Sequence, residues 1–229
     1  LDVCLCTHSP RPDILELVLE SIMNQSVTSE AFSVLLVDNG SSPALEDSLL
    51  DRFTRKGIAA RMVREPILGI ARARLRAITE TNGEMLLFVD DDNELTPQYV
   101  SEGLRFASVH SDVGCFGGKL LLPPDTCPAA WVQPFLPYLA IKDIGDQPLF
   151  GMSVVWASWE PPTAGAFIRR DVLNLYRYRA QRDESIFKLG RTGTKNLSSC
   201  EDSLIMNASS SLGLRNAYNP SLILYHHLD

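Results

Sequence analysis

The sequence predicts an α/β protein with a mostly parallel, doubly wound central sheet flanked by helices. One observation is that short apolar segments alternate with segments of helical spacing through residues 1–122, as successive β-α-β units require. Another is an acidic run, residues 90–92, directly after the apolar residues 85–89. Ligands of such sheets bind at the carboxyl ends of the strands, where this run is expected to lie. Right-handed crossovers then place helices on both faces of the sheet.

Each element of this first part has its own signal. Predicted strands are apolar runs bounded by turn residues, and predicted helices carry apolar residues three and four positions apart. The cluster Asp38-Asn39-Gly40-Ser41-Ser42 is typical of a turn that ends the second strand. The predicted strands are residues 3–6, 32–37, 58–63, 85–89 and 113–122, and the predicted helices are residues 14–23, 45–53, 69–79 and 97–109.

The second part of the chain differs in composition. Residues 123–162 are rich in proline and contain all 3 tryptophans. Two interpretations stay open: a binding loop or lid, or a surface loop packed by its own tryptophans. The pattern beyond it predicts helices over residues 169–178 and 201–212, a polar, mobile segment over residues 182–197, and a closing strand over residues 222–225. We expect one domain with two halves, residues 1–122 and 123–229.

Composition narrows the class of protein. The net charge of −7 argues against a nucleic-acid-binding surface that relies on a global positive field. No apolar run approaches the roughly 20 residues that span a bilayer, and no signal peptide is visible. The 5 cysteines include no CxxC pair, which favours buried free thiols in a reducing cytoplasm. Because the chain begins at Leu1 without a methionine, we expect a trimmed chain or an excised domain.

The acidic run Asp90-Asp91-Asp92 carries the first chemical hypothesis. Neighbouring carboxylates repel one another and lose water when enclosed. A divalent cation relieves both costs, and oxygen ligands suit Mg²⁺ or Mn²⁺. The alternative is a solvated acidic turn in which Asp92 caps a following helix, and the run alone does not decide between them.

Absent motifs argue against several enzyme classes. No GxGxxG follows the first strand, and no GxxxxGK[ST] or GxSxG occurs in the chain. A dinucleotide-dependent dehydrogenase, a P-loop nucleotidase and an α/β-hydrolase are therefore disfavoured.

The remaining motifs resemble glycosyltransferase family 2, the inverting enzymes of the GT-A fold. The resemblance runs from Leu1 to about residue 122, resumes at residues 164–173 and extends through His227. It implies a GT-A, Rossmann-like fold with a nucleotide-sugar-binding half, residues 1–122, and an acceptor-binding and catalytic-base half, residues 123–229. The motifs that carry it are Thr7-His8, Val37-Asp38-Asn39-Gly40-Ser41, Gly69-Ile70-Ala71-Arg72-Ala73-Arg74, Val89-Asp90-Asp91-Asp92 and Cys200-Glu201-Asp202.

The resemblance implies a set of donor-binding residues. Thr7 and Asp38 would hold the nucleotide base, and His8 would stack on it. Arg74 would contact the diphosphate or the base; Leu75 follows it where the family usually has asparagine. Asp90 or Asp91 would contact the ribose. Apart from the resemblance, Arg191 stands in the glycine-containing segment 189–194 upstream of Glu201, which we interpret as a flexible loop that would bring Arg191 to the diphosphate.

Metal and base roles follow in the same way. Asp92, with His226 or His227, would bind Mn²⁺ or Mg²⁺ and so neutralise charge on the leaving diphosphate. Asp202 would be the general base, and Glu201 would help to place the acceptor. Apart from the resemblance, the tryptophan- and proline-rich segment predicts an acceptor near Trp159, Glu160 and Gly165, because aromatic faces stack on sugar rings.

The implied activity is metal-assisted, inverting transfer of a sugar from a nucleotide-sugar, UDP-linked by default, to a hydroxyl. The expected acceptor is a saccharide or a lipid-linked saccharide, which could bring the protein to a membrane surface. Two alternatives stay open. A nucleotidyltransferase would need a glycine-rich, basic loop after the first strand, which residues 6–10 lack. A non-catalytic nucleotide- or sugar-binding module would show no donor hydrolysis.

Overall fold

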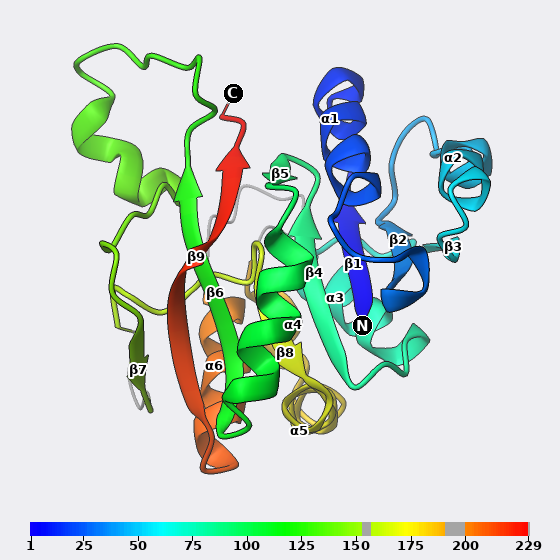
Figure 1. Cartoon of the computed structure of the whole chain (residues 1–229). Coiled ribbons are helices and arrows are strands. Elements are labelled where there is room, and N and C mark those ends of the chain that lie inside the picture. Colours follow the sequence, from blue (N-terminus) through cyan, green and yellow to red (C-terminus); the bar gives the residue numbers. More distant parts are fainter. Residues whose placement is uncertain (153–156, 191–199, 229) are drawn as a thin grey trace.

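The central sheet combines a parallel part from the first half of the chain with a mixed part built from both halves (Figure 1). The computed structural model describes residues 1–152, 157–190 and 200–228. Within them the strands are β1 (Asp2–Thr7), β2 (Ser33–Asp38), β3 (Ala60–Arg64), β4 (Met85–Asp90), β5 (Asn93–Leu95), β6 (Val113–Leu121), β7 (Leu149–Gly151), β8 (Phe167–Arg169) and β9 (Arg215–His226). Their order in the sheet is β3-β2-β1-β4-β8-β6-β9-β5, and β7 pairs with β9.

The parallel part fixes where the site lies. Strands β1, β2, β3 and β4 are parallel neighbours, so their carboxyl ends meet at one edge of the sheet. In this register Thr7 is opposite Asp38, and Cys6 is opposite Asp90. The predicted base-binding and acidic residues are therefore brought to one edge by strand pairing alone.

The mixed part joins the two halves of the chain. Strand β8 lies between β4 and β6 and is antiparallel to both, whereas β9 runs parallel to β6. Strands β5 and β7 are antiparallel to β9. A strand of the second half thus separates two strands of the first, and the halves share one sheet.

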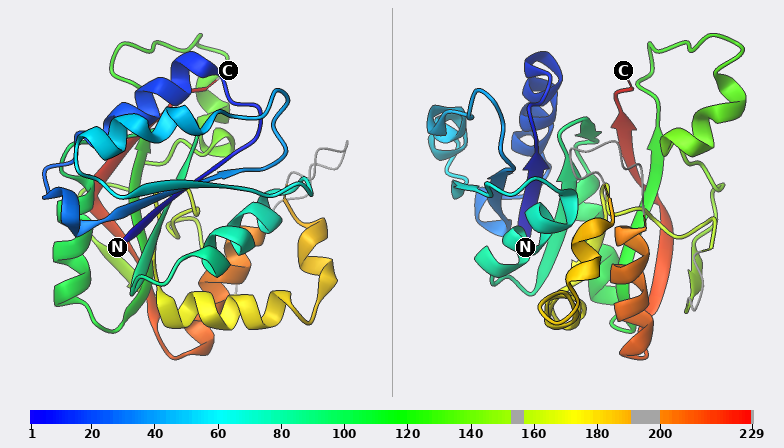
Figure 2. Two further views of the ribbon diagram at one scale, coloured as in Figure 1. Left: turned by 90° about the vertical axis from the view of Figure 1, so that its right-hand side faces the viewer. Right: turned by 180° about the vertical axis from the view of Figure 1, so that it is seen from behind.

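Helices cover both faces of this sheet (Figure 2). One face carries α1 (Pro12–Met23), α2 (Asp51–Arg55) and α4 (Tyr99–Val109), and the other carries α3 (Ile70–Glu80), α5 (Arg170–Ala180) and α6 (Glu201–Ser211). Short 3₁₀ helices are η1 (Ser29–Ala31), η2 (Asp47–Leu50), η3 (Gln133–Leu139) and η4 (Glu184–Lys188). None of the described helices is long and apolar enough to cross a membrane.

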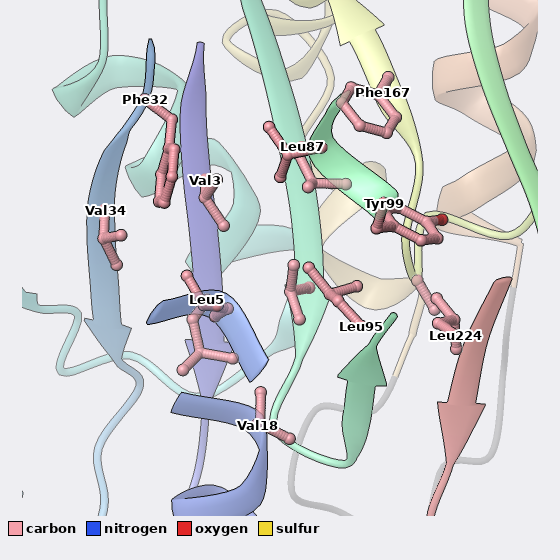
Figure 3. Packing of buried hydrophobic residues seen from close by; sticks show 14 of the residues in the cluster. Val3, Leu5, Val18, Phe32, Val34, Leu87, Leu95, Tyr99, Phe167 and Leu224 are labelled. Atoms are coloured by element: carbon pink, nitrogen blue, oxygen red, sulfur yellow. The ribbon is translucent and has the colours of Figure 1, made fainter. Parts of the chain in front are cut away.

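Two apolar layers hold the helices to the sheet. On β1, Val3 and Leu5 pack in one layer while Cys4 and Cys6 pack in the other, because side chains of a strand alternate between faces. Figure 3 shows the first layer, where the rings of Tyr99 and Phe167 stack 5.8 Å apart. Each such fully buried side chain contributes about 1.5–3 kcal/mol. Burial on both faces explains why the strands are continuous apolar runs in the sequence.

The fold class and the alternation of elements are confirmed, and several details are corrected. The closing strand is β9 (Arg215–His226), not residues 222–225 alone, because Asn216 is buried within it and hydrogen-bonded to Glu160 and to the Met206 carbonyl. Residues 45–53, predicted as one helix, form η2 followed by the short α2. The short strands β5, β7 and β8 were not predicted, since each is only 3 residues long.

The polar segment and the cysteines also differ from expectation. Within residues 182–197, η4 (Glu184–Lys188) is an ordered 3₁₀ turn capped by the Asp183 carboxylate, and residues 191–197 lie outside the described part of the chain. All cysteines are free, but Cys127 and Cys200 are exposed, so only Cys4, Cys6 and Cys115 are buried thiols as predicted.

Candidate active site

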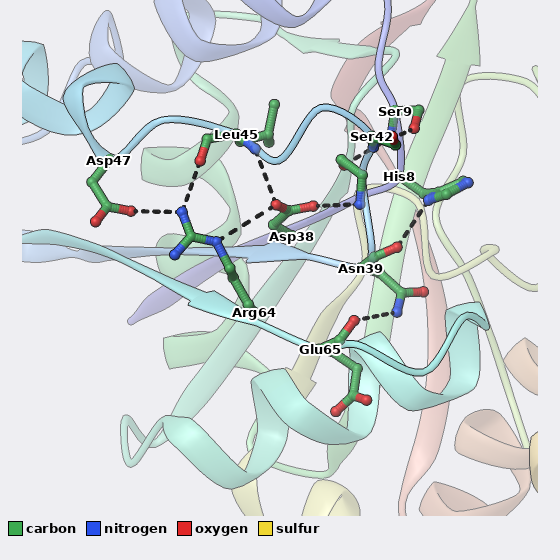
Figure 4. Close-up of polar contacts among 10 residues, drawn as sticks. His8, Ser9, Asp38, Asn39, Ser42, Leu45, Asp47, Arg64 and Glu65 are labelled. Atoms are coloured by element: carbon green, nitrogen blue, oxygen red, sulfur yellow. Dashed lines mark hydrogen bonds and ion pairs between the residues drawn. The ribbon is translucent and has the colours of Figure 1, made fainter.

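Asp38 ends β2 at the edge where the parallel strands meet, and its own loop holds its side chain (Figure 4). Oδ1 accepts a hydrogen bond from the Ser41 backbone N–H at 3.0 Å, and Oδ2 accepts one from Leu45 at 3.1 Å. The guanidinium of Arg64 lies 4.0 Å from Oδ2. Burial alone would raise the pKa of Asp38, but these hydrogen bonds and Arg64 outweigh it and hold the pKa below its usual value.

Asn39, beside Asp38, joins neighbouring loops through hydrogen bonds. The sequence did not single it out as a site residue. Its side-chain amide donates to the carbonyls of Glu65 and Ile67, at 2.9 and 2.8 Å, and its oxygen accepts from the Gly69 N–H at 2.9 Å. Its backbone carbonyl lies 2.9 Å from Nδ1 of His8 (Figure 4). The buried Asn39 therefore ties the loop before α3 to the end of β2 through its side chain, and the exposed His8 through its backbone carbonyl.

The acidic run follows β4 at the same edge. The hydroxyl of Thr7 donates to Oδ2 of Asp91. Burial, against the opposing effect of Arg74 and together with the charges of Asp92, Asp202 and Asp91, raises the pKa of Asp90 to about 6. Burial also raises the pKa of Asp91, which the Thr7 hydrogen bond partly offsets. The run is therefore a concentration of negative charge that a cation would relieve.

Asp92 and His226 come together because β5 pairs with β9. Their Oδ2 and Nε2 atoms are 3.3 Å apart, while His227 instead contacts Glu94 at 2.9 Å. Burial would lower the pKa of His226, but the hydrogen bond and charge of Asp92 outweigh it and raise the pKa. In the described part of the chain, no three His, Cys, Asp or Glu side chains converge as a metal site. One carboxylate and one imidazole fit a cation that takes its other ligands from phosphate and water.

Arg74 reaches from α3 into a cluster of carboxylates. Its side chain is 4% exposed, and its Nη1 donates to Glu201 at 2.9 Å and to Asp202 at 2.7 Å. Its Nη2 lies 3.7 Å from Asp90. Arg72 and Arg76 point elsewhere, since Arg72 stacks on Phe187 and Arg76 pairs with Glu80. A diphosphate contact by Arg74, as predicted from its motif, would require these ion pairs to rearrange.

Asp202 and Glu201 open α6 and differ in exposure. The Asp202 side chain is 23% exposed, and its Oδ1 accepts from Arg74 and from the Thr163 hydroxyl. The Glu201 side chain is 9% exposed, and its pKa is raised by burial and by the charge of Asp202, against the opposing effect of Arg74. Of the two, Asp202 is the carboxylate that a ligand can reach.

The three predicted acceptor residues lie in different environments. Glu160 is fully buried, and its carboxylate accepts from Asn216 and from the Ala157 N–H, so an acceptor contact would require these bonds to break. Gly165 is also buried, with a positive φ of +74°, and a Cβ there would lie 2.5 Å from the Tyr99 hydroxyl. Trp159 is half-buried beside Gly151. Arg191 lies outside the described residues.

With this geometry in view, comparison with known proteins identifies the family. The family model described as glycosyl transferase family 2 matches residues 2–140. The chain belongs to glycosyl transferase family 2. A putative glycosyltransferase, EpsH from Bacillus subtilis (strain 168), is 26% identical to this family 2 chain over 95 residues, which are 42% of the chain and 27% of EpsH.

Solved structures confirm the GT-A fold of this family 2 chain. TarS from S. aureus (residues 1–349) matches 98% of the chain with a TM-score of 0.63 at 16% identity, and the chain spans 59% of that structure. The same TarS fragment has been solved in complex with UDP-GlcNAc. The mannosyltransferase PcManGT from Pyrobaculum calidifontis, in complex with GDP-Man and Mn²⁺, matches all of the chain with a TM-score of 0.63 at 17% identity, and the chain spans 56% of it.

The structure brings some of the residues predicted from the family motifs into direct contact and leaves others apart. Direct contacts join Thr7 to Asp91, Arg74 to Asp90, Glu201 and Asp202, and Asp92 to His226. Asn39 and Thr163 were missed. Asn39 stands within a predicted turn cluster, a signal that could have found it, whereas Thr163 has no local signal because its partner is 39 residues away.

Proposed function

We propose that this protein is an inverting glycosyltransferase that moves a sugar from a nucleotide-sugar to an acceptor hydroxyl, with Asp202 as the general base. The observation that carries this proposal is the position of Arg74. One guanidinium contacts Asp90, at the end of the donor-side strand β4, and Asp202, at the start of α6. The acidic run and the partly exposed Asp202 therefore lie close enough together to act on one nucleotide-sugar and one acceptor.

The proposed reaction is a single displacement. Asp202 accepts the proton of the acceptor hydroxyl, and the resulting oxygen nucleophile forms a bond to the anomeric carbon. The bond from that carbon to the diphosphate oxygen breaks at the same time, and its electron pair leaves with the nucleoside diphosphate. Attack from the side opposite the leaving group inverts the anomeric centre.

A divalent cation, Mn²⁺ or Mg²⁺, is the proposed cofactor. Asp92 and His226 would hold it, and when bound it would neutralise negative charge on the leaving diphosphate. The contact between Asp92 and His226 supports this pair over His227, which contacts Glu94. The presence of Mn²⁺ with GDP-Man in the PcManGT structure is consistent with it.

The proposed donor is a hexose linked to UDP. The complex of TarS with UDP-GlcNAc supports a UDP donor, and the complex of PcManGT with GDP-Man makes a GDP donor the comparison to test. Thr7, His8, Asp38 and Asp91 lie at the carboxyl ends of the parallel strands and would contact the nucleoside. Arg191 is proposed for the diphosphate from its place in a glycine-containing segment upstream of Glu201 alone.

The proposed acceptor is a saccharide or a lipid-linked saccharide. The segment between β6 and β7 exposes the aromatic side chains of Trp131, Phe135 and Tyr138, and aromatic faces suit contact with sugar rings. Trp159 and the turn at Gly165 would border the acceptor. A lipid-linked acceptor would bring the protein to a membrane surface, and the buried free thiols favour a cytoplasmic location.

Calorimetric titration tests this function. UDP, GDP, CDP and dTDP are titrated into the protein with Mn²⁺ and again with EDTA, followed by assays of UDP-GlcNAc and GDP-mannose hydrolysis. We expect one nucleotide to bind only with the metal and its sugar conjugate to be hydrolysed slowly. Metal-independent binding would overturn the cofactor assignment. Binding without hydrolysis would favour a non-catalytic module, and no binding at all would contradict the proposed function.

A further inference from the structure

Asp202 is held through one of its two carboxylate oxygens. Arg74 donates to Oδ1 at 2.7 Å, and the Thr163 hydroxyl donates to the same oxygen. Among the residues that the structure describes, none donates to Oδ2, and the side chain is 23% exposed. Within the described part of the chain, the carboxylate is thus held at Oδ1 and leaves Oδ2 open to a ligand.

Thr163 belongs to a turn that is fastened to the central strand β4. The Gly165 N–H donates to the Phe88 carbonyl at 2.8 Å, and the Phe88 N–H donates to the Ala166 carbonyl at 3.1 Å. The Tyr99 hydroxyl also donates to the Gly165 carbonyl at 2.6 Å. Because Thr163 itself is fully buried, its hydroxyl has a fixed position relative to the sheet.

Arg74 supplies the second fixed donor, and its guanidinium is the cation that hydrogen-bonds directly to this carboxylate cluster. Its guanidinium faces Glu201, Asp202 and Asp90 at once. Its side chain is 4% exposed, so solvent screens these contacts little. A planar guanidinium can donate hydrogen bonds to several carboxylates in fixed directions. A lysine ammonium on a flexible stem cannot hold the same set of directions.

We propose that Arg74 and Thr163 are positioning residues that orient Asp202 for proton abstraction, and that Arg74 serves the base rather than the diphosphate. This inference rests on the proposed function, in which Asp202 is the base. Holding Oδ1 removes rotation of the carboxylate and leaves Oδ2 directed to the acceptor hydroxyl. A reacting group fixed in a productive orientation reacts faster than one that must find it.

The matched pair Thr163→Val and Thr163→Ser tests the hydroxyl. Valine keeps the shape and removes the donor, whereas serine keeps the donor. Hydrolysis of UDP-GlcNAc or GDP-mannose, whichever donor binds, is measured across pH with Mn²⁺. We expect Thr163→Val to lower kcat about 10-fold or more, to leave the donor KM within about 2-fold, and to move the acidic limb of the kcat profile to higher pH. A hydrogen bond to a carboxylate favours its charged form, which explains the last effect.

Thr163→Ser should retain kcat within about 3-fold of the wild type, a rescue that a purely structural role would not give. Equal loss of kcat in both variants, or an unchanged pH profile in Thr163→Val, would overturn the inference. Thermal unfolding of both variants confirms that each is folded under the assay conditions.

Arg74→Lys separates the two roles of the arginine. If Arg74 positions Asp202, kcat falls about 10-fold or more while nucleotide affinity changes less than about 3-fold. If Arg74 binds the diphosphate instead, calorimetry shows the larger loss in nucleotide affinity, and the inference is wrong. Asp202→Asn is measured in parallel. Retained hydrolysis in that variant refutes the base assignment, whereas its loss together with an unaffected Thr163→Val refutes only the positioning roles.

Discussion

Asp38 and Asp202 each lie beside an arginine, but they are held in different ways. Asp38 is 2% exposed, and both of its oxygens accept hydrogen bonds from backbone N–H groups of its own loop. Its partner Arg64 is 55% exposed and lies 4.0 Å away. Asp202 is more exposed, has only Oδ1 engaged among the described contacts, and pairs with a buried arginine at 2.7 Å.

This difference separates a carboxylate that organises its own loop from one that, in the proposed mechanism, accepts a proton. Backbone donors on both oxygens fix Asp38 as an anion and shape the turn that follows β2. Any contact between Asp38 and a nucleotide base must use its remaining lone pairs. Asp202 draws its donors from α3 and from the turn before β8, so its orientation depends on the assembled fold rather than on its own loop.

The largest effect on activity is expected when the carboxylate of Asp202 is replaced. Asp202→Asn should lower donor hydrolysis by about 100- to 10,000-fold, because proton transfer to a positioned base contributes a factor of that order. Nucleotide affinity measured by calorimetry should stay within about 2-fold. Joint loss of turnover and nucleotide binding would contradict the assignment of Asp202 as base.

The turn that carries Thr163 is expected to tolerate little change. A Cβ on Gly165 would lie 2.3 Å from the Leu224 side chain and 2.5 Å from the Tyr99 hydroxyl, at a φ of +74°. We expect Gly165→Ala to lower the free energy of unfolding by about 2–4 kcal/mol through strain and overpacking. Gly213 is the matched control, because its φ is +77° and no atom lies within 4 Å of its added Cβ.

Gly213→Ala should therefore cost only about 1 kcal/mol, the strain alone. Urea unfolding of both variants gives the comparison. Equal losses in the two variants would mean that close packing around Gly165 does not hold the turn.

Asp92 is a third carboxylate to compare, and it contacts the imidazole of His226 rather than an arginine. His226→Ala should weaken Mn²⁺-dependent nucleotide binding by about 10- to 100-fold. His227→Ala, whose side chain contacts Glu94 instead, should change it by less than about 3-fold. Titrations with Mn²⁺ and with EDTA measure both, and a larger effect in His227→Ala would reverse the assignment.

The smallest effect concerns the stability that Asp38 gives its loop. Asp38→Asn should lower the free energy of unfolding by about 1–2 kcal/mol at pH 7, because an amide cannot accept on both sides. The pKa of Asp38 is lowered in the folded protein. Its stabilisation is therefore fully present above the ordinary aspartate pKa of about 4 and is lost as the pH falls through the lowered value.

The difference in stability between wild type and Asp38→Asn should accordingly shrink below about pH 4. Urea unfolding at pH 7 and at pH 3.5 measures it. A difference that stays constant over this range would show that the carboxylate charge does not stabilise the loop.

The sequence predicts the sheet edge where β2 and β4 end better than it predicts the carboxylate cluster around Arg74. Apolar runs that end in Asp38 and in Asp90 locate two strands and their carboxyl ends, because both signals are local. The Arg74–Asp202 contact joins residues 128 positions apart, and Glu160–Asn216 joins residues 56 apart. Tertiary packing decides such contacts, so composition and periodicity could not show that Glu160 is buried or that Thr163 holds Asp202.

The most direct test of the account is the configuration of the first sugar released. The protein is incubated with Mn²⁺ and an α-linked donor, UDP-GlcNAc or GDP-mannose, and the anomeric proton of the free sugar is followed by NMR before mutarotation. A base that activates water opposite the leaving group predicts the β-anomer as the initial product. Initial release of the α-anomer would contradict a single displacement assisted by Asp202.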